Sequence, residues 1–207
     1  MKVSELIKRV RFTIKDENYE DIKQDWIIID VLNSAIAEIL SQTKMIEDIV
    51  EIDLTDGVGI LPDDFLILKN VFTQNGDVIY RATIDYFNRI DDSSIPVNRP
   101  FYVFLKPNKI MIKGYDGNKV KAHIYKTIKI TDENQEVDLK PELIPVVVYK
   151  TAIELYISGR VSAMKIPPSL VEVWMLEVQS RIDSFKNIRI EEDQIKGFVK
   201  IKKDFFK

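Results

Sequence analysis

Hydrophobic residues near the start of the chain recur at the spacing of α-helices. The stripe of a first predicted helix comprises Val3, Leu6, Val10 and Ile14. Ser4 is a good N-cap residue for this helix. A second helix is predicted over residues 25–42 after a polar break at 16–21. Its stripe comprises Trp26, Ile29, Leu32, Ile36 and Ile39. Further apolar residues widen this stripe, so we expect the second helix to be covered on more than one side.

The middle of the chain changes to the two-residue alternation of β-strands. Apolar residues alternate with acidic ones over 50–54, and residues 65–72 are predicted to form a buried strand. Asn75-Gly76 is typical of a tight hairpin that returns through 78–80. A short helix is predicted over 83–90, with Ile84 and Phe87 directed inward. Three further short strands joined by turns are predicted as a meander over 101–106, 110–113 and 120–128.

Helical spacing returns after an acidic loop at 131–138. Pro141 and Pro145 favour the entry to a third long helix, and Gly159 is placed to end it. A fourth helix begins at Pro167-Pro168. Its inward face is predicted to comprise Val171, Trp174, Val178, Ile182 and Phe185. The helical pattern stops after Asn187.

These elements predict an α+β fold. We expect the N- and C-terminal helix pairs to form one four-helix bundle, with a central β-rich insertion, either a small sheet or a sandwich layer, and an extended C-terminal arm. The predicted parts are an N-terminal helical pair at 1–45, the insertion at 46–130, a C-terminal helical pair at 131–187 and the arm at 188–207.

The composition excludes several classes of protein. Of the 207 residues, 45% are hydrophobic and 30% charged, which is ordinary for a globular protein. The net charge of −3 argues against a basic nucleic-acid-binding protein. Cysteine is absent, so neither disulfides nor thiolate sites are available. The start MKVSELIKRV lacks the apolar core of a signal peptide, and no apolar run could span a membrane.

Residues that could carry chemistry are few. His123 is the single histidine and is predicted to lie on the polar face of a strand. The pairs Asp63-Asp64 and Asp91-Asp92 could serve magnesium or glycosidic chemistry, but adjacent acids in turns more often solvate or cap. A hydrolase built on Asp63 and Asp64 stays open as an alternative. The sequence therefore predicts a non-enzymatic protein that binds no cofactor and no metal.

Aromatic residues in the predicted strands allow a second alternative. Tyr102, Phe104, Tyr115 and Tyr125 could form the ligand platform of a β-sandwich module that binds a glycan or host surface. Packing in a core or a subunit interface is the other interpretation of the same residues.

The C-terminal arm carries more apolar residues than an isolated segment normally exposes. The arm residues predicted to dock are Ile195, Phe198, Val199, Ile201, Phe205 and Phe206. Five lysines and one aspartate also lie between 196 and 207. Two interpretations follow: the arm packs on its own helices, or it pairs with a neighbouring subunit.

The order of these segments resembles the head–tail adaptor, or connector ring, proteins of tailed phages. The resemblance is carried by VSELIKRVRFTIKD and DWIIIDVLNSAIAEIL at the start, with Asn33 near the middle of the second helix. It continues through VEIDLTDGVGILPDDFLILKNVFTQNGDVI and YRATIDYFNRIDDSSIPVNRPFYVFLKPNKIMIKG. It closes with DLKPELIPVVVYKTAIELYISGR, so it spans nearly all of 1–190.

This resemblance implies a structural virion protein, made in the host cytoplasm and placed at the head–tail junction. It implies a homo-oligomeric ring, usually of twelve copies, that binds the portal protein above and the next tail or ring protein below. Such a ring extends the DNA channel, through which DNA passes without specific binding, and it has no membrane partner. Phosphates are repelled by acidic walls, so a channel-facing role is predicted for Asp132, Glu133, Glu136 and Asp138.

Overall fold

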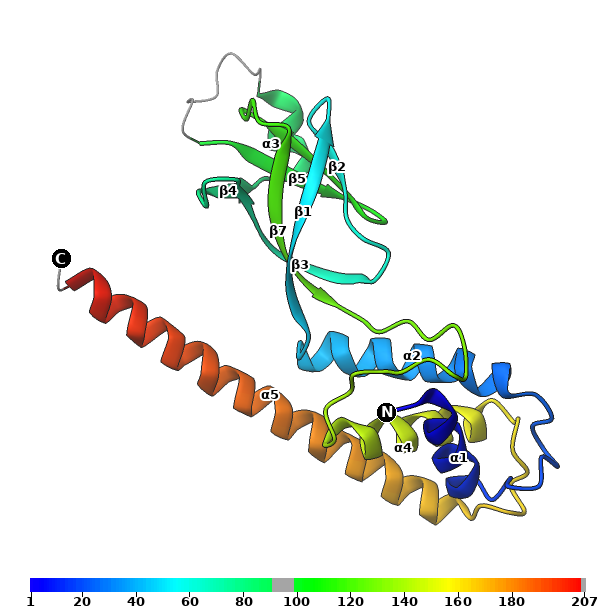
Figure 1. The fold of residues 1–207 in the computed structure, drawn as a ribbon. Helices are drawn as coiled ribbons and strands as arrows, with labels where there is room; N and C mark the ends of the chain where they lie inside the picture. Colours follow the sequence, from blue (N-terminus) through cyan, green and yellow to red (C-terminus); the bar gives the residue numbers. More distant parts are fainter. Residues whose placement is uncertain (91–98, 206–207) are drawn as a thin grey trace. The chain divides into compact units, whose positions relative to one another are not determined.

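The chain forms two compact units, which Figure 1 shows as a group of helices and a group of strands. The computed structural model describes residues 1–90 and 99–205, and over 190–205 it describes the backbone alone. A helical unit combines Met1–Thr43 with Ile128–Lys207, and a barrel unit comprises Lys44–Thr127. The barrel is therefore inserted between two halves of the helical unit.

Four helices make up the described helical unit: α1 (Val3–Thr13), α2 (Asp25–Thr43), α4 (Leu143–Ile157) and α5 (Pro168–Phe205). α4 is the central helix, since it contacts the other three. It is apolar on nearly every side, and even Thr151 is fully buried, with its hydroxyl donating to the Val147 carbonyl at 2.8 Å. A helix that is apolar all round needs partners on all sides, which explains its central place.

The positions of these helices agree with the sequence pattern, but some details differ. Ser4 does not cap α1; the N-cap residue is Lys2, and its side chain forms no capping hydrogen bond. In α2, Ile28 is fully buried, whereas Trp26 is largely exposed. Gly159, which follows the C-cap residue Ser158 of α4, has a φ of +70°, as expected for the residue that ends a helix.

The loop between α1 and α2 is held by a buried ion pair. Arg11 donates from Nη1 to Asp16 Oδ2 at 2.7 Å and to the Ile22 carbonyl at 2.9 Å. Asp16 also accepts from the backbone N–H groups of Asp21 and Ile22. Arg11 and Asp16 are 2% and 1% exposed, so this loop is fixed from inside the unit.

Seven strands close into a barrel in the order β1-β2-β6-β5-β4-β3-β7. Their bounds are β1 (Glu47–Thr55), β2 (Val58–Ile60), β3 (Phe65–Thr73), β4 (Val78–Arg81), β5 (Phe101–Leu105), β6 (Lys109–Lys113) and β7 (Lys119–Lys126). All pairs are antiparallel except β4 with β5. A short helix, α3 (Ile84–Arg89), follows β4. Phe87 is its buried residue, whereas Ile84, predicted to point inward, is half exposed.

The interior of the barrel is filled by alternate residues of its strands. The buried core comprises Ile52, Leu61, Val71, Ile79, Tyr102, Ile110, Ile112, Val120, Ala122 and Ile124. The register places Ala122 opposite both Val50 of β1 and Val71 of β3, which brings strands distant in sequence together. Gly59 faces this core, where a Cβ atom would lie only 2.6 Å from Ile52 Cγ2.

The predicted fold class is wrong. The strands form a closed seven-stranded barrel, so the chain is not a four-helix bundle with a small sheet or sandwich insertion. The predicted meander fails because β7 pairs with β1 and β3 rather than with β6. Alternation identifies the buried face of each strand, but it does not say which strands become neighbours.

The predicted extended arm is also wrong. The backbone of α5 stays helical through Phe205. The segment after Asn187 contains no proline and a single glycine, so it carries no strong signal that would end the helix. Apolar residues after Asn187 recur with only a weak helical period, so the sequence pattern did not predict this part of the helix.

Candidate assembly surfaces

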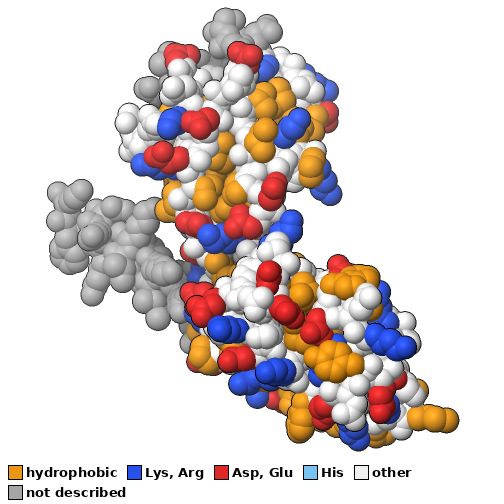
Figure 2. All heavy atoms as spheres, turned by 45° about the vertical axis from the view of Figure 1, so that its right-hand side comes forward, with side chains coloured by type: hydrophobic (Ala, Val, Ile, Leu, Met, Phe, Trp, Pro, Cys, Tyr) orange, Lys and Arg blue, Asp and Glu red, His pale blue; other side chains and the backbone are white. Residues whose placement is uncertain are grey.

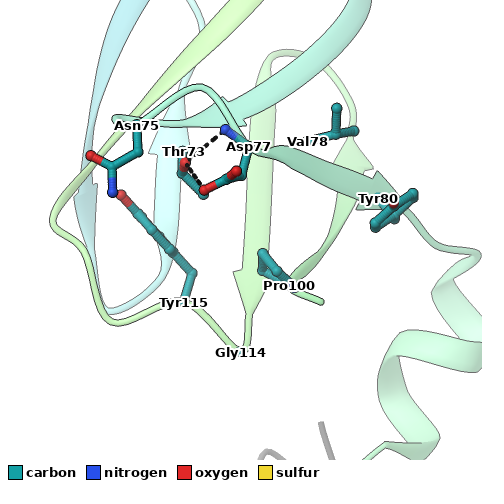
Figure 3. Close-up of a pocket in the computed structure, with 8 residues that line it drawn as sticks. All are labelled: Thr73, Asn75, Asp77, Val78, Tyr80, Pro100, Gly114 and Tyr115. Atoms are coloured by element: carbon teal, nitrogen blue, oxygen red, sulfur yellow. Dashed lines mark hydrogen bonds between the residues drawn. The ribbon is translucent and has the colours of Figure 1, made fainter. Parts of the chain in front are cut away.

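A hollow on the described barrel is lined mainly by residues of the β3–β4 hairpin and of the loop after β6. It has a volume of about 590 Å³ and is drawn in Figure 3. Asp77 and Thr73 are bonded to each other, with the Asp77 N–H donating to Thr73 Oγ1 at 3.1 Å. Tyr115 points its hydroxyl end toward Asn75 in Figure 3 and donates to the Lys119 carbonyl at 2.9 Å. These polar groups close the β3–β4 hairpin and a neighbouring loop.

The residues considered for catalysis are dispersed. His123 Nε2 lies 3.2 Å from Glu47 Oε2 on two paired strands. Asp63 is exposed in a turn, and the main-chain carbonyl of Asp64 accepts from the Thr127 N–H. Asp91-Asp92 lies outside the described residues. Within the described part of the chain, no three His, Cys, Asp or Glu side chains come together as metal ligands.

The four aromatic residues considered as a ligand platform do not share a surface. Tyr102 is buried in the barrel core, and burial raises the pKa of its phenol. Phe104 and Tyr115 are partly buried against the same core, and Tyr125 is buried. The structure therefore favours their packing role over the glycan platform.

A different aromatic group reaches the surface of the barrel. Tyr80 of β4, Tyr86 of α3 and Phe101 of β5 lie together, with ring centroids 6.5 Å apart for Tyr80 and Phe101 and 5.7 Å apart for Tyr86 and Phe101. Tyr80 and Tyr86 are each about half exposed. Sequence reasoning missed this group because β4 pairs with β5 across a long connection.

The acidic loop is anchored through its backbone, with its carboxylates in solvent. Val3 and Ser4 donate their N–H groups to the carbonyls of Gln135 and Glu133, and Val137 donates to the Met1 carbonyl. Val137 and Leu139 are buried. The four predicted channel residues, Asp132, Glu133, Glu136 and Asp138, are all exposed. The loop thus presents negative charge from a fixed backbone.

The side chains of the six predicted docking residues lie outside the described residues. These are Ile195, Phe198, Val199, Ile201, Phe205 and Phe206, of which the first five lie on the α5 backbone.

Two apolar surfaces of the helical unit were not predicted. One is a hollow of about 420 Å³ between α1 and α4. The other is the outward face of α5, where Val173 and Leu176 are exposed. Figure 2 shows hydrophobic side chains reaching the molecular surface among charged ones. An exposed Val or Leu within an apolar stripe has no distinct sequence signal, because the pattern does not say which face is covered.

No described helix is both long enough and apolar enough to cross a membrane. None of the curated proteins compared with this chain matches it. A family model described as SU10 adaptor protein matches residues 1–193, which include the whole barrel unit and the helical unit as far as residue 193 of α5. The family predicted from the sequence is thereby confirmed. The chain belongs to the SU10 adaptor protein family, a family of phage head–tail adaptors.

Proposed function

We propose that copies of this chain form a closed ring beneath the portal that extends the DNA channel toward the tail. The observation that carries this proposal is the match to an adaptor family over 193 of 207 residues. Assembly with phage structural proteins such as the portal and tail follows from membership of that family. The ring position, the channel and a copy number of twelve belong to the proposal.

The physical basis of such a ring is repetition of a moderate contact. Each subunit presents one surface to one neighbour and a different surface to the other, so the ring closes by rotation. Exposed apolar side chains on the helical unit and the barrel supply surfaces of the required kind. We propose that the residues after 187 contribute a further contact to a neighbouring subunit or ring.

We further propose that the acidic loop faces the channel. Four exposed carboxylates lie within the seven residues 132–138, and their backbone is held by the N-terminal strand-like segment. In a ring these charges repeat around the wall, where they repel phosphates and let DNA slide without being retained.

Native mass spectrometry with purified portal rings tests the ring directly. We expect this protein to bind portal rings in multiple copies as one closed set, and a chain that stays unbound at saturating concentration contradicts the proposal.

For the loop, Lys substitutions at the four carboxylates are expected to make assembled rings retain DNA in a salt-dependent way. The matched control carries Lys at four other exposed acidic residues, so that its net charge changes by the same amount; these are Glu17, Asp30, Asp63 and Asp116. Equal DNA retention by both variants, or none by either, contradicts the channel assignment.

A further inference from the structure

The hollow between α1 and α4 has the form and chemistry of a receptor for a helix. It is lined by Lys8, Arg9, Phe12, Thr13, Ile144, Pro145, Val148 and Tyr149. Phe12 lines this hollow and is 74% exposed, so a large aromatic surface is available for contact with a partner. Two antiparallel or crossing helices commonly accept the apolar face of a third helix in such a groove.

The rim of this groove is basic. Lys8 and Arg9 are exposed on α1, and neither forms an ion pair with another described residue. The lining contains no acidic side chain. A fitting helix therefore presents apolar residues together with a carboxylate, since opposite charges at the rim favour correct docking.

The outward face of α5 has this composition. Val173 is 58% and Leu176 72% exposed, and they lie three residues apart on one side of the helix. Glu172 borders them, is exposed and forms no ion pair with a described residue. Ser180 continues the stripe one turn later, which allows close approach to another helix.

A subunit cannot fill its own groove with this face. Val171, Trp174, Val178 and Ile182 on the other side of α5 are buried, and α5 packs through them on α4 and α2. Trp174 stacks on Tyr149 with ring centroids 6.0 Å apart, so the inward face of α5 also supports one wall of the groove. The outward face points away from its own helices.

We propose that the outward face of α5 in one copy packs into the α1–α4 groove of the next copy. The contact joins two different surfaces, so it is heterologous and propagates around a ring. This inference rests on the proposed ring function, for which it names the contact between subunits. Lys8 and Arg9 of one copy face Glu172 of its neighbour.

Cysteine crosslinking tests the contact in the full-length protein, because the natural sequence contains no cysteine. In a variant carrying both T13C in the groove and S180C on the α5 face, which keeps Phe12 and Leu176, a short thiol-specific crosslinker is expected to produce a ladder of dimers, trimers and larger oligomers. Each single variant is expected to give no ladder, because each subunit then has only half of the contact. K23C/K140C, at two exposed positions of the same unit, is the matched control.

The outcome that overturns the proposal is a ladder no stronger than that of K23C/K140C. Rapid dimers of S180C alone also overturn it, since they show a symmetric α5–α5 contact. Thr13 is partly exposed and Ser180 is exposed, so circular dichroism is expected to show folded variants.

Charge exchange provides the second measurement. R9E and E172R are each expected to slow crosslinking of the double-cysteine variant about tenfold, and R9E/E172R is expected to restore it. Failure of the restoration contradicts the assignment of Arg9 to Glu172. Portal rings that still bind wild-type protein while no ladder forms refute this contact and leave the proposed function standing. A ladder without portal binding refutes the proposed function and leaves the contact.

Discussion

Replacing Arg11 with methionine is expected to destabilise the helical unit severely. Methionine keeps most of the apolar volume of the side chain but removes every hydrogen bond of the guanidinium. The Asp16 carboxylate, whose side chain is 0% exposed, then loses its charged partner inside the unit. The Arg11 guanidinium also lies 3.7 Å from the centre of the Tyr19 ring, so a cation–π contact is lost with it.

The magnitude follows from the burial of this pair. Removing one partner of a buried ion pair leaves an uncompensated charge and typically costs about 3–5 kcal/mol. Asp16 keeps two hydrogen bonds from the backbone N–H groups of Asp21 and Ile22, which places the expected loss near the lower end of that range. Such a loss is a large fraction of the stability of an ordinary domain, about 5–15 kcal/mol.

Urea unfolding followed by tryptophan fluorescence measures this effect. Both tryptophans, Trp26 and Trp174, belong to the helical unit, so the signal reports that unit. K23M, an exposed change in the same loop, is the control and is expected to stay within about 0.5 kcal/mol of wild type. A double variant R11M/D16N is expected to lose less than the sum of the two single losses, because the uncompensated charge is gone. A loss below about 1 kcal/mol for R11M would falsify the role given to this pair.

Three further outcomes are expected. G59A forces a Cβ atom against Ile52 and is expected to destabilise the barrel by about 1–3 kcal/mol, measured by thermal unfolding with circular dichroism. I60A on the same strand is the control and is expected to have little effect. Equal unfolding temperatures for the two variants contradict the packing of Gly59 against Ile52. A hydrogen bond from Lys126 lowers the pKa of Asp48, so the charged carboxylate stabilises the fold relative to D48N by at most about 1 kcal/mol. This difference in stability is expected to be fully present above the ordinary aspartate pKa of about 4 and to vanish as the pH falls through the lowered pKa. A difference that is the same at pH 7 and pH 2 refutes the assignment. Deletion of 188–207 is expected to leave a folded protein that no longer assembles on portal rings, and unfolding of the deletion variant would show instead that the segment packs on its own subunit.

The sequence predicted the helices and most strands because each carries a local period. Val171, Trp174, Val178 and Ile182 are buried as their spacing indicated, and Asn75-Gly76 forms the expected hairpin, with Gly76 at a φ of +95°. These features depend on neighbours within one turn or one strand, which is the range that a pattern can report.

Closure of the barrel and the two surfaces of the helical unit could not be predicted in this way. The pairing of β7 with both β1 and β3 is a choice among distant strands, and β2 is too short to show a period. Arg11 and Asp16 would be assigned to the surface from their charge, although the fold buries them together. The exposure of Phe12 and Leu176 became visible only when the covered face of each helix was known.

Electron cryomicroscopy of the head–tail junction in purified virions would show whether this chain forms the proposed ring. We expect a closed ring of this chain immediately below the portal, with α5 of each copy against α1 and α4 of the next and the 132–138 loops lining the channel. Absence of the chain from the junction, or a position away from the path of the DNA, contradicts it.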